Sequence, residues 1–222
     1  MANGDESPSV TMLAKLLPGV RPKPVAELCA AARIETFRGG RAVHAPDEPG
    51  HPGIVVTGLL RTVVTLRNGR RATIHYTGPR GVFGLPRLFT QLSTHVEAIR
   101  DTKLIKIDSA AVTRVALEYP DFGWFISQQV SLAYASLPRV VEELASMTVR
   151  QRLASHLLEL AVRDGGGNLF VEIDQEALAE AVCSVREVVS RALSSLRDDG
   201  LITKAGRLIV IVDEPGLRRT ML

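Results

Sequence analysis

The chain has 222 residues, and 45% of them are hydrophobic, which is enough to bury the core of one large or two ordinary globular domains. Its 27 basic and 24 acidic residues leave a net charge of only +3 at pH 7. A net charge this small argues against a protein that binds nucleic acid through overall positive charge. Any contact with nucleic acid must therefore depend on where individual basic residues lie.

The two cysteines and the first residues of the chain indicate the compartment. Cys29 and Cys183 lie far apart and form no CxxC motif, which argues against a disulfide framework, a zinc finger or an iron–sulfur cluster. The start lacks the features of a signal peptide, and no apolar run reaches the roughly 18 residues of a membrane span. We therefore expect a reduced, cytoplasmic protein that binds no membrane, no metal and no cofactor.

The N-terminal half of the chain predicts a short tail, a helix and an antiparallel β region. Residues 1–10 are polar and turn-rich, which predicts a frayed tail, and residues 24–33 are rich in helix formers after prolines, which predicts a helix. Between residues 35 and 108, short β-prone runs alternate with Gly and Pro, and Asn68-Gly69 predicts a hairpin with a type I′ turn. This spacing predicts a β-roll or barrel of roughly 100 residues.

Residues 120–147 predict a long helix with an apolar stripe along one side. The stripe repeats in steps of four and three residues, the spacing of a coiled-coil seam. Pro138 should kink or break this helix, because it lacks the N–H that would bond to the carbonyl of Tyr134. Two interpretations are open: the stripe packs on its own β-roll, or it pairs with a second copy in a parallel dimer, which its length favours. The stripe consists of Ile126, Val130, Ala133, Leu137, Val140, Leu144 and Met147.

The last third of the chain predicts a winged helix-turn-helix. Residues 150–164 predict an amphipathic helix that ends at the glycines 165–167, followed by a short strand. Asp174 is expected to cap the next helix, and Ser184 and Glu187 to form a capping box at the start of a second one, which ends before Gly200. Residues 201–212 predict a two-stranded hairpin around Ala205-Gly206.

The second helix of this motif carries a polar face that suits DNA. A helix-turn-helix places the start of its second helix in the major groove, where Arg can donate twice to guanine and Glu can accept from cytosine N4. Val185, Val189, Leu193 and Leu196 are expected to point inward, and Glu187 to hold Arg191 in one rotamer. A solvated surface helix with ordinary ion pairs is the alternative. The candidate DNA-binding residues are Ser184, Arg186, Glu187, Ser190 and Arg191, with Gln175, Lys204 and Arg207 toward phosphates.

Residues 174–202, DQEALAEAVCSVREVVSRALSSLRDDGLI, resemble the Crp/Fnr family of bacterial transcription regulators. The likeness lies in the family's T-x-x-E-L-A, turn, R-E-x-x-S-R-x-L and Gly-Leu-Ile pattern, and the similarity covers almost the whole chain after the tail. It implies that Arg186, Glu187, Ser190 and Arg191 read a palindrome with half-sites resembling TGTGA or TTGAT. The implied α+β fold has a flexible tail (1–11), a cyclic-nucleotide-binding-like β-roll with flanking helices (12–119), a dimerisation helix (120–148) and a winged helix-turn-helix (149–222).

The chain departs from this family where cyclic-nucleotide members hold phosphate and ribose. Their cassette reads G-E-L and then R-S-A, whereas the matching stretches here are Gly84-Leu85-Pro86 and Leu92-Ser93-Thr94. Leucine replaces both the glutamate and the arginine, and burying a phosphate without a charge partner is costly, so we do not expect cyclic AMP or cyclic GMP to bind. The candidate effector-pocket residues are Gly84, Leu85, Leu92, Ser93 and Thr94.

The identity of the effector therefore stays open, and so does the role of Cys183. An apolar pocket suits an uncharged aromatic or lipid-like effector, or the roll is only a scaffold, and haem held by His44, His75 or His95 is a weaker alternative. Cys183 stands where the family has Gly in a left-handed turn, at a cost of about 1 kcal/mol. It is expected to pack in the turn, and a redox role through a lowered thiol pKa near Arg186 is a weaker alternative.

Taken together, the sequence predicts a homodimeric, sequence-specific DNA-binding regulator whose partners are double-stranded DNA, a second copy and, as a candidate, RNA polymerase. The competing hypothesis is an effector-binding signalling module whose winged helix mediates protein contact. No nucleophile elbow, metal motif or phosphate loop accompanies the histidines, so we do not expect an enzyme.

Overall fold

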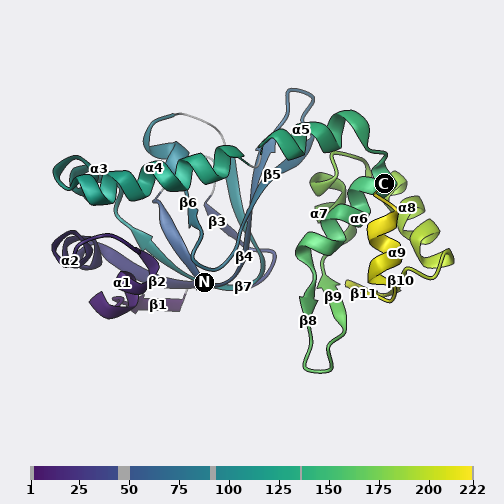
Figure 1. The fold of residues 1–222 in the computed structure, drawn as a ribbon, viewed down its shortest axis with the longest axis horizontal. Coiled ribbons are helices and arrows are strands. Elements are labelled where there is room, and N and C mark those ends of the chain that lie inside the picture. The colour runs from purple at the N-terminus through teal and green to yellow at the C-terminus, as the bar shows by residue number, and fades with distance from the viewer. Residues whose placement is uncertain (1–2, 45–50, 91–93, 136, 222) are drawn as a thin grey trace. The chain divides into compact units, whose positions relative to one another are not determined.

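The computed structural model describes residues 3–44, 51–90, 94–135 and 137–221, which fall into two units (Figure 1). The first unit comprises Met1–Val64 and His75–Ser136, and the second comprises Thr65–Ile74 and Leu137–Leu222.

The first unit begins with a short strand and two helices. Strand β1 (Asn3–Glu6) pairs with β2 (Ala32–Phe37), and α1 (Val10–Leu16) begins at Ser9, whose hydroxyl accepts a hydrogen bond from the Met12 N–H at 3.1 Å. The predicted frayed tail is therefore wrong for these residues, because β2 offers β1 a free edge. Helix α2 (Pro22–Ala30) ends before residue 33, since Ala32 and Arg33 pair with β7 (Thr94–Ile107) instead.

The β region is the predicted antiparallel roll. Its strands are β3 (Ala42–His44), β4 (Gly53–Thr65), β5 (Arg71–Thr77), β6 (Val82–Phe83) and β7 (Thr94–Ile107). The sheet order is β1-β2-β7-β4-β5, with β3 on β7 and β6 on β4. Register shifts bend β4 against β7, which lets the long strands curl around a core that includes Leu60, Phe83 and Leu104.

The hairpin between β4 and β5 forms where it was predicted but with a different turn. Gly69 has a φ of +77°, whereas Asn68 does not have a positive φ. The Gly69 N–H bonds to the Leu66 carbonyl and the Leu66 N–H to the Arg70 carbonyl, so the loop is three residues long and ends in a left-handed glycine. The type I′ prediction is wrong because the Asn68 side chain accepts from the Arg70 N–H at 3.1 Å and stabilises the longer turn.

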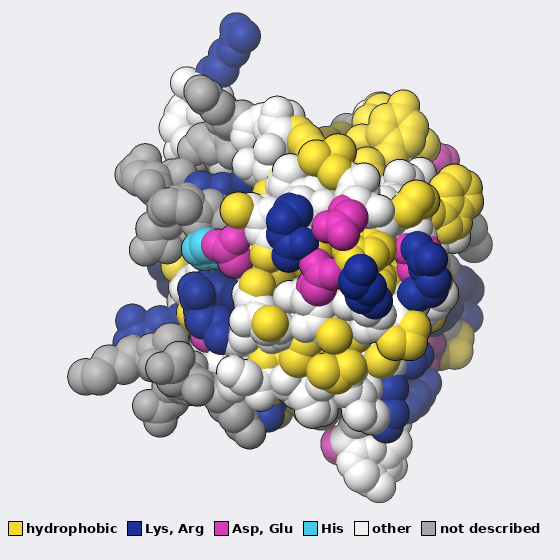
Figure 2. Space-filling model, turned by 90° about the vertical axis from the view of Figure 1, so that its left-hand side faces the viewer, with side chains coloured by type: hydrophobic (Ala, Val, Ile, Leu, Met, Phe, Trp, Pro, Cys, Tyr) yellow, Lys and Arg dark blue, Asp and Glu magenta, His cyan; other side chains and the backbone are white. Residues whose placement is uncertain are grey.

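Two helices cover the roll, and an ion pair ties the second of them to the start of α2. Helices α3 (Ser109–Glu118) and α4 (Pro120–Ala135) bury Val115, Phe122 and Phe125 against the sheet. Arg21 donates to Asp121 across a 3.1 Å ion pair, which lowers the pKa of that carboxyl to about 2. Figure 2 shows this end of the unit, where basic and acidic side chains alternate over the helices.

The predicted long helix is described as two helices, α4 and α5 (Leu137–Ser146), on either side of residue 136, which lies outside the described residues. Pro138 is the second residue of α5, a place where the missing N–H removes no helical hydrogen bond. The kink at Pro138 stays a prediction, because α4 and α5 belong to different units.

The second unit is a winged helix-turn-helix. After α5, its helices are α6 (Val149–Leu160), α7 (Gln175–Ala181), α8 (Arg186–Asp198) and α9 (Glu214–Arg219). Its four-stranded sheet runs β10 (Ile202–Ala205), β11 (Leu208–Ile211), β9 (Leu169–Glu172) and β8 (Val162–Arg163) in that order. The hairpin predicted around Ala205-Gly206 is thereby confirmed.

One boundary in this unit differs from the prediction. Helix α6 ends at Leu160 rather than at the glycines, because residues 162 and 163 pair with β9. The glycines lie in the β8–β9 turn, where the Asp164 carboxylate accepts from the Gly166 and Asn168 N–H groups at 2.9 and 2.8 Å.

Candidate nucleic-acid interface

The turn between α7 and α8 is built from one side-chain cap and one strained residue. The Asp174 carboxylate accepts from the Ala177 N–H at 2.8 Å, which confirms that Asp174 caps α7. Cys183 has a φ of +50°, the left-handed conformation expected of the glycine that it replaces. The Ser184 N–H then bonds back to the Ala179 carbonyl at 2.9 Å and closes the turn.

Helix α8 starts one residue later than predicted. Its N-cap is Val185, and no side chain caps its first turn, so the capping box of Ser184 and Glu187 is not formed. The reason is local, because the Ser184 N–H is used in the turn and Val185 has the extended conformation of an N-cap (φ −111°, ψ 154°).

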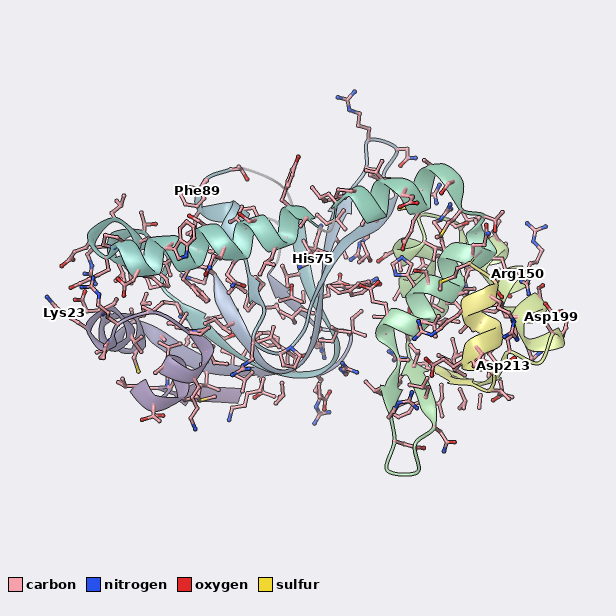
Figure 3. All side chains as sticks on the ribbon, viewed as in Figure 1. Lys23, His75, Phe89, Arg150, Asp199 and Asp213 are labelled. Atoms are coloured by element: carbon pink, nitrogen blue, oxygen red, sulfur yellow. The ribbon has the colours of Figure 1, made fainter. Side chains whose placement is uncertain are left out.

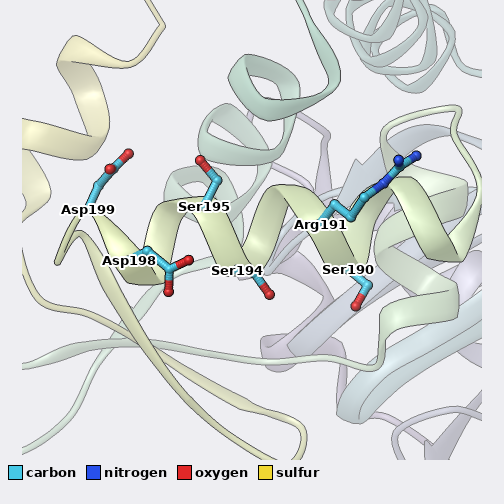
Figure 4. Close-up of a pocket in the computed structure, with 6 residues that line it drawn as sticks. All are labelled: Ser190, Arg191, Ser194, Ser195, Asp198 and Asp199. Carbon is cyan, nitrogen blue, oxygen red and sulfur yellow. The ribbon is translucent and has the colours of Figure 1, made fainter.

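A fully apolar back holds α8 in place. Val189, Leu193 and Leu196 are buried in the unit core, whereas Val185 is 44% exposed and does not point inward as predicted. Arg186, Glu187 and Arg191 are exposed and Ser190 is half-buried, so the candidate base-reading set lies on the outer side of the helix. Ser190 and Arg191 border an open hollow of about 360 Å³, whose other lining residues are Ser194, Ser195, Asp198 and Asp199. Figure 4 shows these six side chains along α8 and at its C-terminal end.

The charges on this face are not engaged with the protein. Among the described residues, Glu187 and Arg191 make neither a hydrogen bond nor an ion pair, so the expected contact that would hold Arg191 in one rotamer is not formed in this structure. Arg186 is in the same situation within the described chain. These side chains are therefore free to meet a polar ligand without first breaking a protein contact.

The candidate phosphate contacts flank the helix. Gln175 is the first residue of α7, where unpaired backbone N–H groups favour an anion. Lys204 lies half-buried on β10, and Arg207 lies exposed in the β10–β11 turn, 3.8 Å from the Asp174 carboxylate. An exposed pair at this distance contributes little to stability, so Arg207 can exchange Asp174 for a phosphate at small cost.

Cys183 behaves as a packing residue. Burial raises the pKa of its thiol, and the positive charges of Arg152 and Arg70 only partly offset that effect. The weaker alternative, a thiol pKa lowered by the helix start and Arg186, is therefore wrong, since the removal of water around the half-buried sulfur outweighs nearby charge.

The apolar stripe on α4 and α5 is only partly covered. Ile126 packs against the core of the first unit, which is the own-roll interpretation at that one residue. Val130, Leu137 and Leu144 are 49%, 43% and 46% exposed, and Ala133 is exposed as well. Val140 and Met147 are half-buried.

Other apolar side chains on these helices are exposed too, although the sequence pattern did not predict them. Trp124, Leu132, Tyr134 and Val141 are 67%, 67%, 71% and 64% exposed. They fall outside the four-three spacing of the stripe, so that spacing alone could not find them.

The candidate effector residues do not form a polar site in the described chain. Gly84 (φ +80°) precedes a 3₁₀ turn, η1 (Leu85–Leu88), and Leu85 is buried, where it lines an apolar cavity of about 20 Å³ with Phe122 and Ile126. That space holds about one water molecule. Thr94 is buried and its carbonyl accepts from Arg87 at 3.3 Å, whereas Leu92 and Ser93 lie outside the described residues.

Two buried cations of the roll are paired with carboxylates. Arg61 on β4 donates to Glu97 on β7 at 2.7 Å, and Lys106 contacts Glu35 at 3.0 Å. His75 and His95 are half-buried, and the side chain of His44 lies outside the described residues. Within the described chain, no group of three His, Cys, Asp or Glu side chains is arranged to hold a metal ion.

Each of the two units contains a region that matches a known domain family. Residues 34–119 match the cyclic nucleotide-binding domain family, and residues 151–220 match the Crp-like helix-turn-helix domain family. A CRP-like cAMP-activated global transcriptional regulator of Mycobacterium tuberculosis is 29% identical over 218 residues, covering 93% of this chain and 96% of that protein. The chain belongs to the Crp/Fnr family of transcription regulators. It is a regulator with a helix-turn-helix DNA-binding domain.

Further relatives support this assignment of the regulator. Transcriptional regulator SdrP of Thermus thermophilus is 28% identical over 191 residues, covering 82% of this chain and 91% of that protein. A solved CRP-family transcriptional regulator, also from Thermus thermophilus, superposes with a TM-score of 0.68 at 26% identity, over 84% of this chain and 95% of that one. No helix among the described residues of the regulator is long and apolar enough to cross a membrane.

Proposed function

We propose that the regulator binds a palindromic DNA site as a homodimer, with the start of α8 from each copy in the major groove, and that it needs no cyclic nucleotide to do so. The observation that carries the proposal is the surface of α8. Two arginines and a glutamate stand unengaged on its outer face, while its back is fixed by side chains that are almost completely buried. Such a helix presents base-reading groups in a fixed orientation.

The charge of the second unit favours two copies for each site. From residue 149 to the C-terminus the chain has ten basic and eleven acidic residues, so this region is not basic overall. One copy therefore gains little from general attraction to phosphates, which supplies most non-specific affinity. Two linked copies bind adjacent half-sites together, so that modest contacts at each half-site add up to specific binding.

The exposed apolar side chains of α4 and α5 supply the surface for pairing. Contiguous apolar surface on a folded chain costs free energy in water, and contact with an identical stripe on a second copy removes it. Val130, Leu137 and Leu144 lie at seam positions and are roughly half exposed in the single chain. A parallel pair would place the two DNA-binding units side by side, as a palindrome requires.

The roll supports independence from cyclic nucleotides. Leu85 stands where the family's glutamate would bind ribose hydroxyls, and it is buried in hydrocarbon. The positive charges of Arg61 and Lys106 are already neutralised by Glu97 and Glu35. A phosphate that contacted Arg61 or Lys106 would have to compete with the carboxylate that already pairs with it.

The experiment that tests this function is selection of bound sequences from a random duplex library, with purified full-length regulator, no added ligand and a fixed moderate salt concentration. The expected result is enrichment of a two-fold palindrome. Substitution of both Arg186 and Arg191 by Ala should abolish that enrichment. A folded dimer that enriches nothing, or a double variant that enriches the same sequence, would overturn the proposal.

A further inference from the structure

Val185 is an exposed apolar side chain on the face that otherwise carries charged and hydroxyl groups. It is 44% exposed although it occupies the N-cap of α8, where Ser, Thr, Asp and Asn are preferred because their oxygen accepts a backbone N–H. Helices α6, α7 and α9 of the same unit follow that preference with Thr148, Asp174 and Asp213. Among these four described helices, only α8 forgoes its cap in favour of a branched hydrocarbon.

The geometry places this hydrocarbon at the leading end of the helix. The Val185 carbonyl accepts hydrogen bonds from the Val188 and Val189 N–H groups at 3.1 Å each. These bonds make Val185 the N-cap, so that the helix itself begins at Arg186. The extended conformation of the N-cap keeps its side chain outside the core in which Val189 is completely buried. A group at this place enters the major groove together with Arg186, because the N-terminal part of the second helix approaches the base edges.

We infer that Val185 is a specificity-determining residue that contacts the C5-methyl group of a thymine in each half-site. This methyl is the apolar group that thymine presents on the major-groove edge, and a branched aliphatic side chain is its matching partner. Contact removes both apolar surfaces from water. The inference rests on the proposed function and adds a thymine to the bases that Arg186 and Glu187 would read.

The test uses the duplex selected with the full-length regulator. Each thymine of the half-sites is replaced in turn by deoxyuridine, which removes only the C5-methyl group. At one position we expect affinity to fall roughly fourfold per substituted half-site, the factor expected from one methyl group returned to water. The other thymines should show no such loss.

Two variants separate recognition from folding. Val185→Ser removes both methyl groups but supplies a hydroxyl that can cap α8, so its Tm should equal or exceed that of the wild type while it binds the thymine and deoxyuridine duplexes equally. Val10→Ala is the matched control, because Val10 is 45% exposed at the start of α1, and it should keep the full discrimination.

The outcomes are distinct. If the wild type binds thymine and deoxyuridine duplexes equally at every position, or Val185→Ser still discriminates between them, Val185 is an ordinary exposed apolar residue and this inference alone is wrong. If no duplex is enriched by a folded dimer, the proposed function is wrong and the inference falls with it.

Discussion

Helix α8 and the 3₁₀ turn η1 lie at the two places where the family's chemistry is concentrated, and they have diverged to different degrees. In α8 the charged side chains stand on the outer face above a buried apolar back, in the pattern that the sequence shares with the family. In η1 the position of the family's glutamate holds Leu85, which packs into the core. The proposed base-reading residues of α8 match the family's pattern, whereas Leu85 offers hydrocarbon where the family pattern has a glutamate.

The difference teaches that the two sites face opposite solvation demands. A recognition helix keeps its charges hydrated until DNA arrives, so Arg186 and Arg191 cost the free protein little. A nucleotide pocket must hold charge inside a roll, where it is costly unless a ligand or a carboxylate neutralises it. A leucine at this position avoids that cost, and this is why the proposed function needs no cyclic nucleotide.

The largest expected effect comes from breaking the proposed dimer, which would leave only one α8 helix for each bound protein. Leu144→Asp places a charge on the exposed seam and should convert the dimer into a monomer, because a buried unpaired carboxylate is costly. Affinity for the selected palindrome should fall by about a hundredfold or more, since the half-sites are no longer bound as a linked pair. Light scattering and anisotropy titration check the two effects.

A matched control comes from α3. Leu117 is 84% exposed and lies outside the stripe, so Leu117→Asp should remain dimeric and bind DNA normally. An intact dimer for Leu144→Asp would contradict the assigned interface.

Next in size is the removal of a base-reading group. Arg186→Ala should weaken binding to the selected palindrome about thirtyfold or more, because each copy loses contacts worth about 1–3 kcal/mol. Arg197 is exposed in the last turn of the same helix, and Arg197→Ala should change affinity by less than about twofold. Equal losses for the two variants would mean that α8 contributes only general charge.

The replacement at η1 predicts that cyclic nucleotides do not stabilise the protein. A ligand at about 100 times its Kd stabilises a protein by about 2.7 kcal/mol, which raises the Tm of a chain of this size by several degrees. Cyclic AMP or cyclic GMP at about 1 mM should shift the Tm of the regulator by less than about 1 °C, as scanning calorimetry would show, because Leu85 offers no polar contact. A saturable upward shift would show that the roll still binds a nucleotide.

The smallest effect concerns the turn before α8. Burial raises the pKa of the Cys183 thiol, so the reactive thiolate is scarce at neutral pH and becomes more abundant as pH rises. Alkylation of Cys183 by iodoacetamide at about pH 7.5 should be several times slower than that of glutathione and should accelerate up to and beyond the ordinary thiol pKa of about 8.5. Peptide mass spectrometry distinguishes it from Cys29. Alkylation faster than glutathione would support a redox role instead.

Sequence patterns predicted the parts of the molecule that local chemistry decides. Val189, Leu193 and Leu196 fixed the buried side of α8, and Asp174 marked the start of α7, since apolar periodicity and caps act within a few residues. The start of α8 was predicted one residue too early. A backbone hydrogen bond from the Ser184 N–H to the Ala179 carbonyl, five residues back, moves the N-cap to Val185. The end of α6 was missed for a similar reason, since strand pairing with β9 overrode a continuing helical pattern.

The exposed surface of α4 and α5 was the least predictable part of the molecule. Heptad spacing identified Val130 and Leu144, but exposure of Trp124 and Tyr134 depends on which side of α4 the β-roll covers. That choice is made by tertiary packing of Phe122 and Phe125, which no local pattern encodes. Burial of Leu85 likewise depends on contacts with residues far away in the sequence, so the loss of the ribose-binding carboxylate was predictable from the sequence but the place of Leu85 in the core was not. Figure 3 shows the side chains that lie between the helices and strands of the first unit.

The central claim is that two α8 helices, held by one dimer, read the two halves of a palindrome without an effector. The most direct measurement compares the affinity of the ligand-free regulator for the selected palindrome and for the same duplex with five base pairs inserted between the half-sites. The insertion turns one half-site to the opposite side of the DNA, since a helical turn takes about 10.5 base pairs. The account predicts at least about a hundredfold weaker binding. Equal affinity for the two duplexes would contradict it.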